Sequence, residues 1–193
     1  MRLTCGRAMV CLLASILLAA QRLAEPTSLQ AVPDVVDGDS LVFNIRLRGI
    51  DAPEYDQQCK TAAGECYPCG EKSMRSLQAL LRGSTNETGA GEGHVSCLFH
   101  EMDRYGRAIM SCDLLGGRSL AEGMVRQGQA ILAPKYIQSP TRLKRYRAAQ
   151  AEAKQHRRGL WQGSFDTPAQ WRSGQRLCPA SEGRQLNPDA IAP

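Results

Sequence analysis

The sequence has few of the features that mark several large protein classes. It holds three histidines in 193 residues, His94, His100 and His156, and they are scattered along the chain. No GxSxG or HExxH segment occurs, so the sequence gives no support to a nucleophilic serine site or a zinc protease site. No internal repeat is visible, and after residue 20 no apolar run is long enough to span a bilayer.

The N-terminal segment has the pattern of a signal peptide. Arg2 and Arg7 precede the apolar run 8–20, which ends in small residues and is too short for a membrane-spanning helix. We expect cleavage after Ala20 or Ala24, a secreted or periplasmic protein, and no stable membrane association. Loss of residues 1–20 removes two arginines and no acids, so the net charge falls from +5 to +3. A mildly basic chain of this kind suits a polyanionic substrate.

The cysteine pattern agrees with export. Cys5 and Cys11 leave with residues 1–20, and six cysteines remain, an even number that favours disulfides in an oxidising compartment. One CxxC segment, Cys66 to Cys69, has neither a second CxxC nor a histidine nearby, which favours disulfides over a zinc site. The sequence leaves open how Cys59, Cys66, Cys69 and Cys178 pair.

Local patterns predict strands and three helices. Apolar and polar residues alternate over 35–50, which is typical of strand structure, and the Gly- and Ser-rich stretch 84–93 predicts a loop. Helical spacing over 70–82 stops at Gly83. The S-x-x-E segment from Ser119 predicts a capping box and a short helix ending near Gly128. A further helix is expected from Ser139-Pro140 to His156. This order indicates an α+β fold with a small closed sheet.

A hairpin is predicted around Asp103-Arg-Tyr-Gly106, between two apolar-rich stretches. A hairpin centred on Arg104 and Tyr105 places Cys97 opposite Cys112. Cβ atoms of opposed residues on neighbouring strands lie near the distance of a disulfide. The sequence therefore predicts a Cys97–Cys112 bridge.

Two kinds of charged residue gather in three short segments. Asp37-Gly-Asp39-Ser40 and Asp51-Ala52-Pro-Glu54 offer carboxylate and carbonyl oxygens, which suit Ca²⁺ or Mg²⁺. Arg46 and Arg107 offer forked donors that match phosphate oxygens and could stabilise charge during phosphoryl transfer. Each segment alone is weak evidence, because Asp-Gly pairs are common in turns and arginines are common on surfaces.

Together these segments resemble the staphylococcal-nuclease-like family, and the likeness runs from Val35 to Trp161, including Leu120–Ala130 and Gly159-Leu-Trp161. The resemblance implies a small five-stranded OB-type β-barrel with three helices, and a Ca²⁺-dependent phosphodiesterase acting on DNA and RNA. It further implies residue roles: Asp39, Asp51 and the Ala52 carbonyl as calcium ligands, Glu54 as general base, Arg46 and Arg107 as phosphate-gripping groups, and Arg104, Tyr105 and Tyr136 as substrate contacts.

The sequence also departs from this family. Six residues separate Asp39 from Arg46, fewer than the family usually has, and Pro134 takes the place of a second substrate-side tyrosine. We expect a signal peptide over 1–20, a monomeric nuclease-like domain over 29–163 that binds nucleic acid, and a polar C-terminal tail over 164–193. Two other interpretations stay open: an OB-type nucleic-acid-binding module that has lost turnover, and an exported structural domain without a nucleic-acid role.

Overall fold

The computed structural model describes residues 34–35, 38, 40–83, 95–114 and 116–179. The expected signal peptide, the expected loop 84–93, Asp37 and Asp39 lie outside the described residues. Among the helices described, none has the length and apolar character needed to cross a membrane.

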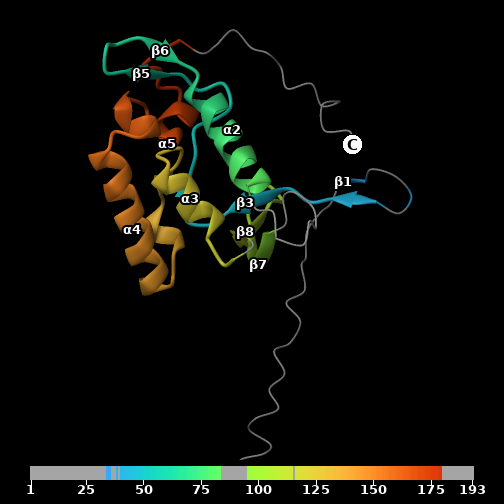
Figure 1. The fold of residues 1–193 in the computed structure, drawn as a ribbon. Coiled ribbons are helices and arrows are strands. Elements are labelled where there is room, and N and C mark those ends of the chain that lie inside the picture. Colours follow the sequence, from blue (N-terminus) through green and yellow to red (C-terminus); the bar gives the residue numbers. More distant parts are fainter. Residues whose placement is uncertain (1–33, 36–37, 39, 84–94, 115, 180–193) are drawn as a thin grey trace, which may run out of the picture. The chain divides into compact units, whose positions relative to one another are not determined.

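The described strands form four small sheets (Figure 1). The three-stranded sheet that concerns the site joins β3 (Ile45–Leu47), β8 (Ala108–Leu114) and β7 (Val95–Met102), with β3 parallel and β7 antiparallel to β8. The other sheets are β1 (Asp34–Val35) with β2 (Leu41–Val42), β4 (Ile50–Asp51) with β9 (Ile131–Leu132), and β10 (Gly163–Ser164) with β5 (Cys59–Thr61) and β6 (Cys66–Tyr67).

The alternating stretch 35–50 is not one continuous strand. It is divided among β1, β2, β3 and the start of β4, and Val42 and Phe43 are both exposed although they are neighbours in sequence. Gly49, with φ +83°, turns the chain between β3 and β4. A closed five-stranded barrel is not confirmed, because the strands of the described residues fall into separate sheets.

The predicted helices are present. They are α2 (Cys69–Arg82), which ends at Gly83, α3 (Leu120–Arg126) and α4 (Pro140–Gln155). The Ser119 hydroxyl accepts from the backbone N–H of Glu122, and the Ser139 hydroxyl accepts from Arg142. Serine hydroxyls therefore cap α3 and α4, although the Glu122 carboxylate pairs with Arg126 and Arg145. Two 3₁₀ helices, η1 (Pro134–Tyr136) and η2 (Gly159–Gln162), follow β9 and α4.

A fourth helix, α5 (Pro168–Arg172), lies in the segment expected to be a polar tail. Thr167 and Gln170 form a reciprocal capping box, and Pro168 occupies the first turn. The part of this segment up to residue 179 is therefore folded, and residues 180–193 lie outside the description.

The core lies where α3 and α4 pack on the short strands. Val125, Ala130, Ala149 and Tyr146 are almost fully buried, and the Tyr146 hydroxyl pairs with that of Ser119 across 2.6 Å. Burial raises the pKa of Tyr146, so its hydroxyl stays neutral and keeps this hydrogen bond.

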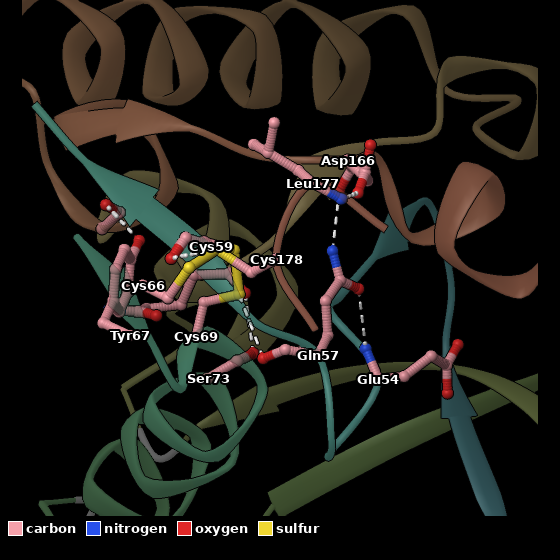
Figure 2. The surroundings of a disulfide bond; sticks show 12 residues. Glu54, Gln57, Cys59, Cys66, Tyr67, Cys69, Ser73, Asp166, Leu177 and Cys178 are labelled. Atoms are coloured by element: carbon pink, nitrogen blue, oxygen red, sulfur yellow. Dashed lines mark hydrogen bonds between the residues drawn. A yellow bond between two sulfur atoms is a disulfide. The ribbon is translucent and has the colours of Figure 1, made fainter. Parts of the chain in front are cut away.

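Three disulfides are formed. The predicted Cys97–Cys112 bridge is confirmed, and the two residues are register partners on β7 and β8. The pairings left open are Cys59–Cys69 and Cys66–Cys178 (Figure 2). The latter joins residues 112 positions apart and anchors the segment after α5 to the β5–β6 hairpin.

Candidate active site

The register of the three-stranded sheet places two predicted site arginines on one face. Arg46 on β3 is the partner of Ile109 on β8, and Arg107 lies two residues before Ile109. Side chains at paired positions, and at positions two apart along a strand, point to the same side. Arg46 and Arg107 therefore share one face of the sheet.

This face forms the floor of a cleft of about 940 Å³. The cleft is rich in arginine, and the two tyrosines that line it, Tyr105 and Tyr136, are exposed. The predicted site residues that line it are Arg46, Glu54, Arg104, Tyr105, Arg107 and Tyr136, and they are joined by Glu101, Asp103 and Arg172.

Asp51 and Glu54 converge on a single positive group. Nη1 of Arg172 lies 2.6 Å from Glu54 Oε1 and 3.2 Å from Asp51 Oδ1, and Nη2 lies 2.7 Å from Asp51 Oδ2. Arg46 donates to Asp51 Oδ1 across 2.9 Å. Hydrogen bonding to Asp51 raises the pKa of Arg172, burial lowers it, and hydrogen bonding to Glu54 raises it again. The net effect is a raised pKa, so the guanidinium is always charged.

The backbone of Glu54 is fixed by Gln57, whose side chain is fully buried (Figure 2). Gln57 Oε1 accepts from the N–H of Glu54 at 3.2 Å, and its Nε2 donates to the carbonyl of Asp166 at 2.7 Å. Its backbone N–H donates to the Glu54 carbonyl, and its own carbonyl accepts from Gly70. A single buried side chain thus joins the acidic loop to the segment that precedes α5.

Gly70, near the start of α2, supports the same loop and yields a prediction. A Cβ at this position would overlap the backbone carbonyl oxygens of Glu54 and Tyr55. We expect Gly70→Ala to lower the free energy of unfolding by about 1–3 kcal/mol, because neither carbonyl can move without breaking the loop. Thermal unfolding measures this loss. Gly83→Ala at the other end of α2, where contacts are looser, should change stability by less than about 0.5 kcal/mol, and equal losses would contradict the packing argument.

Arg107 is oriented by the turn of the β7–β8 hairpin. Its Nε lies 2.7 Å and its Nη2 2.6 Å from Asp103 Oδ2, and Asp103 Oδ1 accepts from the N–H groups of Tyr105 and Arg107. Burial disfavours the charged carboxylate, but these hydrogen bonds outweigh it and hold the pKa of Asp103 below its usual range. Asp103 therefore stays ionised at neutral pH and positions the guanidinium.

The structure brings together most of the predicted site residues. Asp51 does not line the cleft but reaches it through Arg46 and Arg172, which do. Ala52 is half-buried against the core, next to Asp51. Asp39 lies outside the described residues, so its position relative to Asp51 stays a prediction.

Sequence reasoning missed Arg172 and Gln57. The segment Thr167-Pro-Ala-Gln170 is a T-x-x-Q capping box with proline at its first helical position, a signal that predicts α5. No local pattern indicates that α5 lies against Asp51 and Glu54.

The carboxylate oxygens of Asp51 and Glu54 are the kind of ligand that a hard divalent cation binds. Two carboxylates already share one cationic group, and oxygen ligands are those that Ca²⁺ and Mg²⁺ prefer. Within the described residues no group of three Asp, Glu, His or Cys side chains could hold a metal, so a complete site would need a further donor such as Asp39.

The arrangement is a cleft on an α+β fold, with forked arginines, which suit anions, beside a carboxylate pair. Residues 44–163 match the family model described as staphylococcal nuclease homologue, and the chain belongs to this family. The family implies an OB-type α+β fold.

Several individual proteins are similar to this chain. The chain is 30% identical over 141 residues to the succinoglycan biosynthesis protein ExoI of Rhizobium meliloti, covering 72% of this chain and 66% of that protein. It is 28% identical over 154 residues to the probable endonuclease LCL3 of Schizophyllum commune, covering 73% and 48%. It is 30% identical over 141 residues to an uncharacterized endonuclease of Escherichia coli, covering 69% and 77%. The chain thus spans about two thirds of the first relative and about half of the second.

Proposed function

We propose that the protein is a secreted or periplasmic, Ca²⁺-dependent nuclease that hydrolyses phosphodiester bonds of DNA or RNA. The observation that carries the proposal is the placement of Glu54, Arg46 and Arg107 around one cleft, with Asp51 bonded to Arg46. Family membership and relatives named as endonucleases support it. We also propose that it acts as a monomer.

In this proposal each side chain has one task. Arg46 and Arg107 bind the non-bridging oxygens of the scissile phosphate and stabilise the charge that develops there. Glu54 takes a proton from the attacking water, whose oxygen bonds to phosphorus as the bond between phosphorus and the sugar 5′ oxygen breaks. The leaving 5′ oxygen takes a proton from solvent. Ca²⁺, held by Asp39, Asp51 and the Ala52 carbonyl, would when bound neutralise a non-bridging oxygen.

The exposed groups at the cleft would contact the rest of the strand. Arg104 and Arg107 lie 4.8 and 5.4 Å from the ring centre of Tyr105, and Arg48 holds the Tyr136 carbonyl at 2.6 Å. Aromatic rings beside cations bind single strands by stacking and charge, which favours single-stranded substrates.

Incubation of circular single-stranded DNA with the protein tests the proposal. We expect linear fragments and acid-soluble nucleotides with Ca²⁺. With a chelator we expect intact circles, because the Asp39 and Asp51 carboxylates would lack the Ca²⁺ that they hold in this proposal. DNA that is retained by the protein but stays intact in Ca²⁺ would favour a binding module, and neither retention nor cleavage would favour a structural domain.

A further inference from the structure

The segment after the matched region 44–163 contributes a charged group to the site. Arg172 ends α5, and its two terminal nitrogens contact three oxygens of Asp51 and Glu54 at 2.6 to 3.2 Å. Its side chain is 42% exposed, so it can leave the carboxylates without crossing the core.

Arg172 is held at this place by a built structure. Trp171 beside it is buried, and Arg176 stacks on the Trp171 ring at 3.7 Å. Asp166 connects the segment at two points, since its carbonyl accepts from Gln57 and its carboxylate accepts from the N–H of Leu177 at 2.6 Å (Figure 2). The Cys66–Cys178 disulfide closes the segment onto the β5–β6 hairpin. The contact is therefore part of the fold.

The charges of this cluster are already balanced. Asp51 and Glu54 carry two negative charges, and Arg46 and Arg172 carry two positive ones. The affinity of a calcium site depends on how many uncompensated carboxylates it offers. A dication entering beside both guanidiniums would meet no net negative charge from these four groups, so withdrawal of a guanidinium would favour its binding.

We propose that Arg172 is the resident cation of the Asp51–Glu54 pair, and that a divalent cation binds Asp51 in competition with it. The inference rests on the proposed function only for the binding of the cation at Asp51. Arg46 is less suited to withdraw, because it lies on the strand β3, whereas Arg172 lies at the end of a short helix. Arg172 lines the same cleft as Arg46 and Arg107, so the released guanidinium stays beside the substrate.

Calorimetric titration of the disulfide-bonded protein with Ca²⁺ tests the competition. We expect Arg172→Gln to bind Ca²⁺ about tenfold more tightly than the unchanged protein, a coupling of usual size between two ligands. Arg147→Gln, the same charge change at an exposed position of α4, should leave the affinity unchanged. The double variant Arg172→Gln/Asp51→Asn should lose the gain, because Asp51 is the carboxylate for which the two cations compete. Equal or weaker binding by Arg172→Gln would overturn the inference.

Two further outcomes keep the test decisive. If Arg172→Gln does not fold by circular dichroism, Arg172→Lys decides, because a point charge cannot bond both carboxylates as the fork does. Tighter Ca²⁺ binding by the lysine variant supports the competition, and wild-type affinity overturns it. Equal Ca²⁺ binding by wild type and Arg172→Gln defeats this inference alone. Absence of Ca²⁺ binding in every variant defeats both the inference and the cation dependence of the proposed function.

Discussion

Glu54→Gln is expected to slow hydrolysis of single-stranded DNA by about 100- to 10,000-fold, the usual contribution of a general base. Glutamine cannot take a proton from water at neutral pH. Its amide oxygen can still accept the hydrogen bond that Arg172 donates to Glu54. The backbone contacts of residue 54 with Gln57 also remain. Release of acid-soluble nucleotides in Ca²⁺ measures the rate.

A matched control separates proton transfer from charge. Glu101 lines the same cleft, and Glu101→Gln removes the same formal charge. We expect its rate to stay close to that of the unchanged protein. Equal losses in the two variants would mean that cleft charge sets the rate, and full activity of Glu54→Gln would remove Glu54 from the chemistry.

Arg107→Gln is expected to lower kcat by about 100- to 1,000-fold, as the loss of one donor to a developing oxyanion usually does. The guanidinium is held by Asp103 through both Nε and Nη2, which leaves its remaining donor directions fixed toward the cleft. Such orientation acts mainly on the transition state, so the effect should fall on kcat more than on KM.

Arg107→Lys refines this prediction. Lysine keeps the charge but cannot form a fork, so its kcat should lie between those of the unchanged protein and Arg107→Gln. Arg118→Gln, an exposed arginine in the loop after β8, serves as the control for net charge. A lysine variant as active as the unchanged protein would contradict the role of the fork.

Local signals in the sequence predicted local structure well. Gly83, Ser119 and Ser139 fix ends of α2, α3 and α4, because caps satisfy backbone groups within a few residues of themselves. Cys97 lies opposite Cys112 as predicted, but the turn itself is centred on Tyr105, since Met102 pairs with Ala108. A β-bulge between Phe99 and Glu101 shifts the register by one residue and restores the cysteine pairing, which the turn position alone would not give.

Long-range placement could not be derived in the same way. Four cysteines allow three pairings, and only the folded chain selects Cys66–Cys178 and with it the position of α5. Arg172 meets Asp51 across 121 positions of sequence, and no periodicity encodes such a contact. The proximity of Arg46 to the acids was an expectation from the family, and the structure shows it in the hydrogen bond to Asp51.

The bounds of the strands around the acidic segments were harder still to predict from the sequence. Alternation over 35–50 predicted strand structure, yet β2 and β3 are only two and three residues long, and Val42, Phe43 and Ile45 are exposed. Short strands carry few ladder hydrogen bonds, so turn geometry at Gly49 and pairing with β8 decide where they end.

A crystal structure of Glu54→Gln with Ca²⁺ and a short single-stranded DNA oligomer would show where substrate and cation bind. We predict a phosphate between Arg46 and Arg107, Ca²⁺ on the Asp51 carboxylate, and the Arg172 guanidinium withdrawn from Asp51. An oligomer bound away from this cleft, or a cation that leaves Asp51 untouched, would contradict this prediction.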